Sequence, residues 1–320
     1  MTRVLVTGSE GYIGTHLVRV LCACDWIDVV VGLDVGGASF DHPKYQFVRR
    51  DVRQPIADLV SRHGIQTVVH LAYVVAPIHD EEQTNEVNLR GMANVLDACA
   101  GLQDAHLLYT SSATVYGLHP DNEVPLTEDS PLRPNDDFPY ARTKGQTEEM
   151  LRRFAADHPQ VRVTVLRPCF VVGPGASDPL ARHLHKRIVF RPWSPAPLQF
   201  VHVQDLGGVM RYFVAHPRPG VYNVAGAGEI TFAEMLKMVG SIGFPLRWPV
   251  LYALNRLCWL LRLSFMTYVP SPALRMLKYP WQVSADKLRR EVGYEFAYDS
   301  RSAFQDFADA VRKSRRRIWG

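Results

Sequence analysis

The sequence lacks the features that would place it in a membrane or outside the cell. None of its 320 residues belongs to an uncharged apolar run of about 18 residues, the length a membrane helix needs. The N-terminal MTRVLVTG does not have the layout of a signal peptide. Cysteine is scarce, and the five cysteines form an odd set without a CxxC pair, which argues against a disulfide framework and a zinc site. We therefore expect a cytoplasmic protein without a membrane span, a structural disulfide or a bound metal.

Strong charge of one sign is also missing. The formal net charge of +4 is too small to indicate a nucleic-acid partner. The nearest approach to a membrane span, residues 249–266, is interrupted by Asn255, Arg256 and Arg262, so we predict an amphipathic helix that is buried or at the surface. Residues 312–317 carry five positive charges, and we predict a solvated helix end there.

Short apolar runs alternate with helical patterns along the chain, which is long enough for one large domain and a smaller one. The runs predict strands at 3–7, 29–33, 45–48, 67–71, 106–110, 162–166 and 220–224. The clearest helices are predicted at 85–100 and 141–156. This order predicts an α/β fold, a Rossmann-type doubly wound parallel sheet with a smaller C-terminal substrate-binding lobe. The sheet domain is assigned to 1–166 and 198–228, and the lobe to 167–197 and 229–320.

A glycine motif follows the first predicted strand and opens the first helix. Gly8, Gly11 and Gly14 form G-x-x-G-x-x-G, which lets the backbone approach a pyrophosphate at the helix N-terminus. Asp34 ends the second predicted strand, where a carboxylate accepts hydrogen bonds from the adenosine ribose hydroxyls. It would repel a 2′-phosphate, and residues 35–37 offer no cation to bind one. The sequence therefore predicts NAD rather than NADP, although a glycine turn and a loop aspartate also occur for purely structural reasons.

A second set of residues predicts proton transfer. Tyr140 and Lys144 stand one helical turn apart and share a helix face, where a nearby cation favours the phenolate. A tyrosinate takes a proton from a substrate hydroxyl while hydride leaves the same carbon. Ser112 follows a predicted buried strand, at the sheet edge where such folds bind ligands, and is placed to hold the substrate oxygen. Each pattern is common by itself, so the prediction depends on their combination.

The motifs together resemble those of the extended short-chain dehydrogenases/reductases, in the NAD-dependent epimerase/dehydratase family. They are TGSEGYIG at 7–14, Asp51-Val52, His70-Leu-Ala, VNLRG around Asn88, SSATVYG from Ser111, YARTK from Tyr140, LRPCFVVGPG from Leu166, FVHVQDL from Phe200 and YNVAG from Tyr222. The resemblance runs from Val4 to about Val224 and returns at 283–294.

The resemblance implies roles for individual residues. Tyr140 would be the catalytic base, Lys144 its pKa-lowering partner and ribose anchor, and Ser112 the partner of the substrate hydroxyl. Further cofactor-binding residues would be Tyr12 and Ile13 at the pyrophosphate, Asp51 and Val52 beside the adenine, and Leu71, Ala72, Tyr73, Asn88 and Pro168 along the cleft.

The residues after the fifth predicted strand distinguish reactions within the family. Dehydratases of the family carry Thr-Asp-Glu, whereas Ser112-Ala113-Thr114 stands here, so no acid pair for elimination is present. SATVYG is similar to the UDP-galactose 4-epimerases. We therefore expect an NAD-dependent sugar epimerase, acting on a nucleotide-linked sugar by transient oxidation.

The predicted lobe departs from the nucleotide-sugar pattern. Phe170 replaces an asparagine near the substrate diphosphate, and Leu198 followed by Gln199 replaces an arginine, which removes charge-assisted contacts to phosphate. The segment 175–199 is also short for wrapping a nucleotide. Cations that either replace these contacts or form a solvated loop are Arg182, His183, His185, Lys186, Arg187 and Arg191.

Two alternatives therefore stay open beside the epimerase. One is an NAD-dependent alcohol dehydrogenase or ketoreductase acting on a less anionic substrate, which the apolar residues 251–266 would suit unless they only pack the core. The other is a cofactor-binding subunit without catalysis. By analogy with the family we also expect a homodimer through 85–100 and 141–156. Its candidate contacts, which would otherwise face the chain's own sheet, are Met92, Leu96, Met150 and Leu151.

Overall fold

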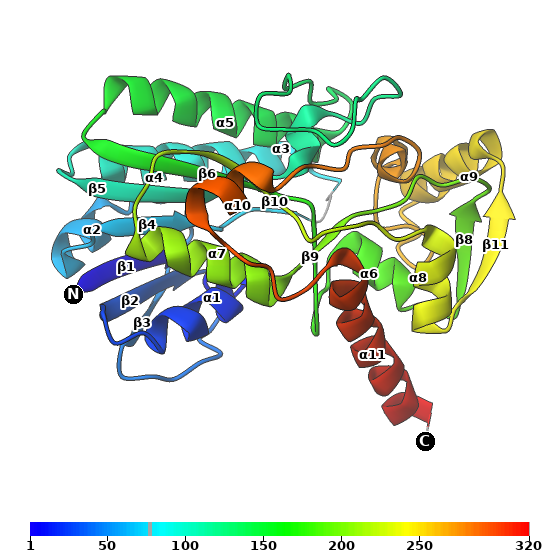
Figure 1. The fold of residues 1–320 in the computed structure, drawn as a ribbon, viewed down its shortest axis with the longest axis horizontal. Helices are drawn as coiled ribbons and strands as arrows, with labels where there is room; N and C mark the ends of the chain where they lie inside the picture. The colour runs from blue at the N-terminus through cyan, green and yellow to red at the C-terminus, as the bar shows by residue number, and fades with distance from the viewer. Residues whose placement is uncertain (76–78, 320) are drawn as a thin grey trace.

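Seven parallel strands form the main sheet, in the order β10-β6-β5-β4-β1-β2-β3 (Figure 1). A computed structural model describes residues 1–75 and 79–319 of the chain. The strands are β1 (Thr2–Thr7), β2 (Ile27–Asp34), β3 (Tyr45–Arg49), β4 (Thr67–His70), β5 (Ala105–Thr110), β6 (Val161–Pro168) and β10 (Gly220–Val224). Each coincides within a few residues with a predicted strand, and the Rossmann-type fold is confirmed.

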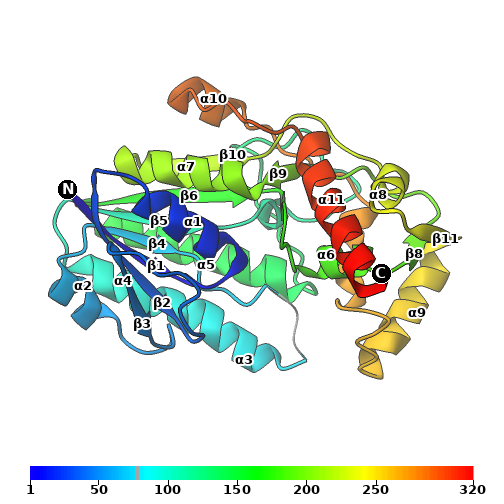
Figure 2. The same ribbon diagram turned by 90° about the horizontal axis from the view of Figure 1, so that it is seen from below.

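Helices cover both faces of this sheet (Figure 2). One face packs against α1 (Tyr12–Cys22) and α7 (Val203–Ala215), and the other against α2 (Ala57–His63), α4 (Gly91–Ala100) and α5 (Pro139–Asp157). In β1, Val4 and Val6 belong to the first core cluster while Leu5 belongs to the second. Successive side chains point to opposite faces, so a strand buried on both faces is apolar at every position.

The helix predicted at 85–100 is longer and less regular than its sequence pattern indicated. It begins as α3 (Glu81–Asn85), continues as the π-helical turn η1 (Glu86–Arg90) and ends as α4. Asp80 caps its start by accepting a hydrogen bond from the backbone N–H of Gln83 at 2.9 Å. Within the π turn lies Asn88, whose Oδ1 accepts from the backbone N–H of Val74 at 2.8 Å. The wide turn therefore coincides with a predicted cofactor residue, as π-bulges often do at functional sites.

The remaining elements gather mainly beyond the carboxyl ends of the strands. They are η2 (Ala113–Tyr116), β7 (Phe170–Val172), α6 (Pro179–Leu184), β8 (Ile188–Pro192), β9 (Phe200–His202), α8 (Phe232–Val239), β11 (Ile242–Leu246), α9 (Trp248–Leu260), η3 (Ser271–Leu277), α10 (Asp286–Val292) and α11 (Ser300–Trp319). Many of them share a third core cluster. Val283 and Leu288, however, pack into a cluster of the main sheet. The exact domain boundaries stay a prediction.

Helix α9 covers most of the segment predicted as an amphipathic helix, and helix α11 contains the one predicted as a basic helix end. The amphipathic helix predicted within 249–266 is α9, and among the described residues no helix is long and apolar enough to cross a bilayer. In the basic run, Arg315 donates hydrogen bonds to the carbonyls of Leu184, Lys186 and Val239 at 2.8–2.9 Å. The prediction of a solvated end is therefore wrong for Arg315, because it ties α11 to the ends of α6 and α8.

Candidate active site

The loop between β1 and α1 leaves its backbone open to a ligand. Gly8 has φ +70°, and a Cβ there would lie 2.6 Å from the Ala72 nitrogen. A Cβ at Gly14 would lie 2.0 Å from the Gly8 oxygen, so neither position accepts a larger residue. α1 begins after Gly11 without a side-chain cap, which leaves N–H groups of its first turn without a side-chain acceptor. These features fit an anionic group such as a pyrophosphate.

Asp34 lies beside this loop, in a fixed orientation. Its Oδ2 accepts from the backbone N–H of Glu10 and its Oδ1 from that of Gly36, both at 3.1 Å. Glu10, which the sequence analysis did not single out, accepts from Tyr45 Oη and from the backbone N–H of Ser39, both at 2.8 Å. Two carboxylates therefore stand at this corner, which favours ribose hydroxyls over a 2′-phosphate.

Asp51 and Val52 stand further along the sheet edge. Asp51 pairs with Arg53 at 2.6 Å, and this hydrogen-bonded cation lowers the pKa of the Asp51 carboxyl. Val52 packs on Gly91 and its carbonyl accepts from Asn94 Nδ2 at 2.8 Å. Their contact with adenine stays a prediction.

Tyr140, Lys144 and Ser112 come together between β5 and α5. Tyr140 and Lys144 lie one turn apart on α5, and Ser112 precedes η2. Burial raises the pKa of Tyr140 to about 12, a hydrogen bond with Ser112 opposes the rise, and the charge of Asp178 adds to it. In the chain alone the phenol therefore keeps its proton at neutral pH, and positive charge near it is needed to form the phenolate.

Lys144 is held by a set of contacts of its own. Its Nζ donates to the Thr110 carbonyl at 2.7 Å and to Tyr109 Oη at 3.0 Å, and lies 3.5 Å from the centre of the Tyr73 ring. Burial lowers the pKa of Lys144 well below its usual value. Tyr73 also packs edge-on against Tyr140 at 5.8 Å between ring centres, so the Tyr73 ring contacts both Lys144 and Tyr140. The effect of Lys144 on the Tyr140 proton stays a prediction.

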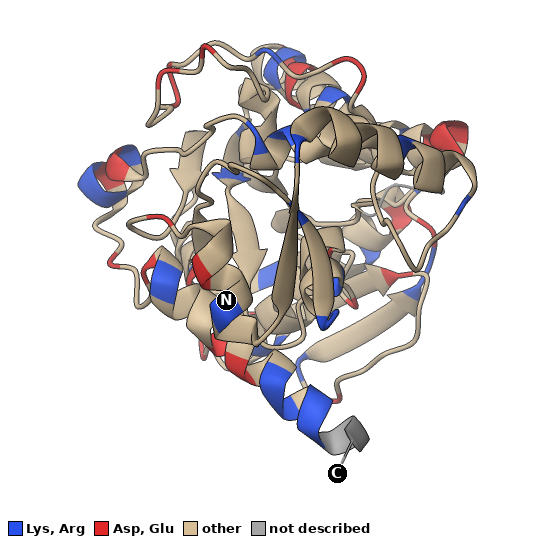
Figure 3. Ribbon diagram, turned by 90° about the vertical axis from the view of Figure 1, so that its right-hand side faces the viewer, with Lys and Arg blue, Asp and Glu red and all other residues tan. Residues whose placement is uncertain are grey.

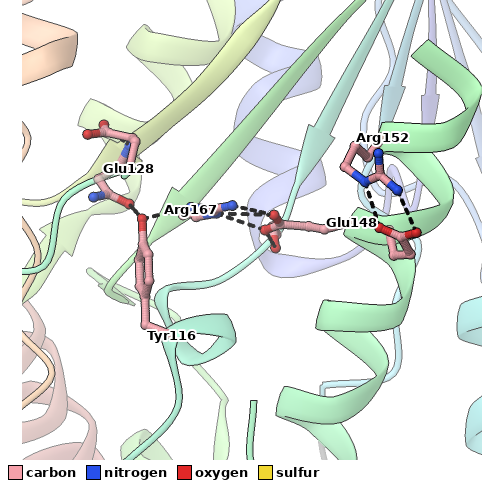
Figure 4. Close-up of polar contacts among 8 residues, drawn as sticks. Tyr116, Glu128, Glu148, Arg152 and Arg167 are labelled. Carbon is pink, nitrogen blue, oxygen red and sulfur yellow. Dashed lines mark hydrogen bonds and ion pairs between the residues drawn. The ribbon is translucent and has the colours of Figure 1, made fainter. Parts of the chain in front are cut away.

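A buried ion pair, which the sequence analysis missed, braces this region (Figure 4). Arg167 of β6 and Glu148 of α5 meet at 2.6 Å, with only 5% and 7% of their side chains exposed. Glu148 also accepts from Ser111 Oγ at 2.5 Å, and Arg167 donates to Tyr116 Oη at 2.8 Å. Tyr116 in turn donates to Asn223 Oδ1 at 2.8 Å. The network joins α5, β6, β10 and the loop that carries Ser112.

One cavity of about 480 Å³ brings most of the predicted site residues together. Those that line it are Gly8, Gly11, Tyr12, Ile13, Gly14, Leu71, Tyr73, Ser112, Tyr140, Lys144 and Pro168. Those outside its lining are Asp34, Asp51, Val52, Ala72 and Asn88. The glycine loop and the proposed acid–base group therefore share one space.

The far part of the cavity is apolar. Its side chains there come from β7, β8, α9, η3 and the segments that follow α9 and η3, and include Phe170, Phe190, Leu251, Leu254, Met266, Leu274, Met276, Leu277 and Trp281. Phe170 packs edge-on against Trp281 at 5.2 Å between ring centres. Leu198 is buried in the third core cluster, and Gln199 donates to the Val283 carbonyl at 3.1 Å. The positions that departed from the nucleotide-sugar pattern therefore pack the fold or present apolar surface.

Few charged groups border this apolar part. Of the six cations considered as phosphate ligands, Arg182 and His183 line the cavity. Burial lowers the pKa of His183 to about 4, so it is neutral at pH 7. Asp178 also lines the cavity, and its Oδ1 caps α6 by accepting from Leu180 N at 2.9 Å. The sequence analysis missed Asp178, although an Asp-Pro pair before a helical pattern is a usual capping signal.

The chain matches a family of known proteins over most of its length. The model of the NAD dependent epimerase/dehydratase family matches residues 4–225. The chain belongs to this family. As a member of an NAD-dependent family of enzymes, it has NAD as its cofactor, which confirms the cofactor predicted from the sequence.

Some relatives of this family member have a named activity, and others do not. An uncharacterized protein of Mycobacterium tuberculosis is 27% identical over 313 residues, which cover 95% of this chain and 82% of the relative. A UDP-glucose 4-epimerase of Lactobacillus helveticus is 32% identical over 183 residues, 55% of this chain and 53% of the relative. The structure of UDP-glucose 4-epimerase from Thermus thermophilus in complex with NAD superposes with a TM-score of 0.76 at 22% identity, covering 97% and 99% of the two chains. That likeness shows the shared fold.

The carboxylates at the end of β2 predict the choice of cofactor in this family member. We expect NAD to bind at least about tenfold more tightly than NADP, because Asp34 and Glu10 oppose the added phosphate. Titration of both cofactors by calorimetry measures the ratio. The Asp34→Asn variant, which keeps the side-chain shape, should narrow it. Equal affinity of the unaltered protein for both cofactors, or tighter binding of NADP, would contradict the role of this corner.

Proposed function

We propose that this enzyme transfers hydride between NAD and a carbinol carbon of its substrate, with Tyr140 as the base. The observation that supports this is the single cavity lined by the glycine loop, Ser112, Tyr140 and Lys144. NAD, when bound, accepts the hydride that leaves the carbinol carbon. Gly8, Gly11 and Gly14 leave room for its pyrophosphate, and Asp34 would bind its ribose.

The chain's own residues would handle the proton. Tyr140 Oη takes it from the substrate hydroxyl, so the alcohol becomes a carbonyl as the hydride leaves. Ser112 hydrogen-bonds the same substrate oxygen and keeps it beside the phenol. Burial raises the pKa of Tyr140. The role we assign to Lys144 is to oppose this rise, since a positive charge near the phenol would favour the phenolate. The reverse proton transfer accompanies return of the hydride.

The relatives favour an epimerase as the outcome of this step. In that case the carbonyl turns over in the cavity and the hydride returns to its other face, without net consumption of NAD. Support comes from the relatives named UDP-glucose 4-epimerase and from Ser112-Ala113-Thr114, which offers no acid pair for elimination. The substrate would then be a sugar and, by analogy with these relatives, a nucleotide sugar.

The cavity lining favours a second outcome, an NAD-dependent alcohol dehydrogenase or ketoreductase. Phe170, Trp281 and their apolar neighbours form the part of the cavity beyond Ser112 and Tyr140, and Asp178 adds a carboxylate that opposes an anionic substrate. Such a lining suits a less anionic substrate with apolar surface. In this case the carbonyl product leaves and reduced cofactor accumulates.

One assay distinguishes the two outcomes. The protein is supplied with NAD and either a UDP-hexose or a panel of apolar secondary alcohols, and both NADH absorbance and the stereochemistry of the recovered substrate are followed. An epimerase forms the stereoisomer of the UDP-hexose without net NADH. A dehydrogenase leaves the UDP-hexose unchanged and forms NADH with an apolar alcohol. Absence of both products with every substrate would contradict the proposal and favour the non-catalytic subunit.

We also propose a cytoplasmic location and a homodimer. All five cysteines are free thiols, which supports a reducing compartment such as the cytoplasm. For the homodimer, Met92, Leu96 and Leu151 belong to the second core cluster, and Met150 packs against it. These side chains face the chain's own sheet, so a dimer through the two long helices would need other contacts.

A further inference from the structure

One end of the molecule carries an exposed apolar surface that the proposed function does not use. It consists of the β8–β11 ribbon, the segment after β8 and the outer side of α9 with the loop that follows (Figures 1 and 2). We call it the α9–β11 surface. Its exposed large apolar residues are Ile188, Phe190, Trp193, Ile242, Phe244, Val250, Leu257, Leu260, Leu261 and Phe265. Trp193, Leu260 and Phe265 keep 67%, 68% and 68% of their surface exposed, which is unusual for side chains of this size.

The register of the ribbon places four of these side chains together. β8 and β11 pair in parallel, with Ile188 opposite Ile242 and Phe190 opposite Phe244. Partner residues in register lie on the same face of a sheet, and residues two apart on a strand also share it. Ile188, Ile242 and Phe244 are exposed, with Phe190 at the cavity edge. The ribbon therefore presents an apolar face to solvent.

α9 is apolar on two adjacent sides. Leu251 and Cys258 are buried and line the cavity. Val250, Leu257 and Leu261 follow one another at helical spacing, and each exposes more than half of its surface. Burial against the chain's own core therefore explains only one side of the helix.

The chain segments that form this surface contain basic residues and no acidic ones. The segments 179–204 and 235–285, which contain β8, β11 and α9, carry no aspartate or glutamate. Arg247, Arg256 and Arg262 are exposed, and none of the three forms an ion pair with a residue in the described ranges. Figure 3 turns this end toward the viewer, with basic residues in blue and acidic residues in red.

We propose that the α9–β11 surface docks on an anionic lipid bilayer. Exposed Trp, Phe and Leu side chains enter the boundary between headgroups and acyl chains, while arginines remain with the lipid phosphates. Both contacts are needed, and the surface offers both. A second copy of the chain fits less well, because a two-fold contact pairs a surface with itself and would bring the arginines of both copies together without acids between them.

The docking surface is continuous with the cavity. Phe190 has 39% of its surface exposed and also lines the cavity, and α9 faces both. An apolar substrate dissolved in the bilayer would therefore have a path into the cavity along α9 and β8. This consequence depends on the second outcome under the proposed function, whereas bilayer docking itself does not.

Sedimentation with lipid vesicles tests the docking. The full-length protein is mixed with vesicles of phosphatidylcholine alone or of phosphatidylcholine with phosphatidylglycerol. We expect clear binding to the anionic vesicles and much weaker binding to the neutral ones. Replacing Arg247, Arg256 and Arg262 with glutamine should weaken binding to the anionic vesicles roughly 100-fold.

A matched control variant removes the same number of positive charges from a different part of the surface. Arg62, Arg152 and Arg153 are also exposed but lie on α2 and α5, and their replacement with glutamine lowers the net charge by the same amount. This control should bind vesicles as the unaltered protein does. A third variant, Trp193→Ser with Leu260→Ser and Phe265→Ser, should lose binding to vesicles while it retains NAD binding, because none of the three residues lines the cavity.

Three results would overturn the proposal. The first is no binding of the unaltered protein to anionic vesicles. The second is equal weakening by the control, which would mean that net charge alone controls the binding. The third is a fall from dimer to monomer mass in the serine variant without lipid, measured by sedimentation, which would assign the surface to a contact between copies. None of these depends on turnover, so failure of the docking and failure of the proposed reaction are separable.

Discussion

Replacing Tyr140 with phenylalanine is expected to lower kcat by about 10²–10⁴-fold, the range for loss of a positioned acid–base group. The change removes only the phenolic oxygen, and the ring still packs against Tyr73. Binding of NAD should be retained, because the glycine loop and Asp34 are untouched. Activity of the unaltered enzyme in the oxidising direction should rise with pH, because the proton-accepting phenolate forms more readily as pH increases. Single-turnover measurement of NADH formation at several pH values, with NAD binding followed separately, tests both expectations.

A control variant distinguishes loss of the Tyr140 hydroxyl from a general disturbance of the aromatic rings packed around it. Tyr73 is a second tyrosine of the same cavity, and its hydroxyl is hydrogen-bonded to Thr143. Tyr73→Phe should reduce activity far less than Tyr140→Phe. If the Tyr140→Phe variant keeps full activity with every substrate that the unaltered enzyme accepts, Tyr140 is not the base. If instead no substrate of the unaltered enzyme is found, a non-catalytic role gains support.

Replacing Arg167 with methionine is expected to lower the free energy of unfolding by about 3–5 kcal/mol. The substitution leaves the buried Glu148 carboxylate without its cation and removes the donor to Tyr116. A carboxylate that cannot be solvated has to take up a proton or distort its surroundings, and either costs stability. Unfolding in urea, followed by tryptophan fluorescence, measures the change. Pairing the substitution with Glu148→Gln should recover part of the loss, because no charge then remains buried.

An exposed arginine on α5, the helix that carries Glu148, provides the comparison. Arg152 pairs with Glu149 at 2.7 Å, but 71% of its side chain is exposed against 5% for Arg167. Solvent screens that pair, so Arg152→Met should leave stability unchanged within error. Similar stability losses for Arg152→Met and Arg167→Met would contradict the importance of burial. A stable Arg167→Met variant would show that the network does not brace the fold.

The fold could be predicted closely where the signal is local. Continuous apolar runs marked the strands of the main sheet because helices bury both of its faces, and the glycine spacing marked the turn because a Cβ at Gly8 or Gly14 would meet backbone. The strands β7, β8, β9 and β11 went unpredicted. They have three to five residues, and prolines within or beside β7, β8 and β11 interrupt the apolar runs that marked equally short strands of the main sheet. The π turn at Glu86–Arg90 was missed because it keeps a helical pattern.

The site was predicted in part for the same reason. Tyr140 and Lys144 share a helix face by spacing alone, and Ser112 follows a strand that ends at the same sheet edge. Arg167 and Glu148 gave no signal, because an arginine and a glutamate 19 residues apart reveal neither their burial nor their contact. Asp178 was overlooked in a segment treated as a loop.

By itself the sequence determined the order of strands and helices, the phosphate loop and the pairing of a phenol with an ammonium, because each is set by neighbours within a few positions along the chain. Only the tertiary structure decided which side chains line the cavity beyond Tyr140, which charges are buried together and which apolar side chains remain in water. Those properties depend on residues that are distant in the chain and meet only after folding. The cavity lining and the exposed apolar side chains concern which substrate fits and which surface of the protein it meets. The local motifs concern the cofactor and the reaction.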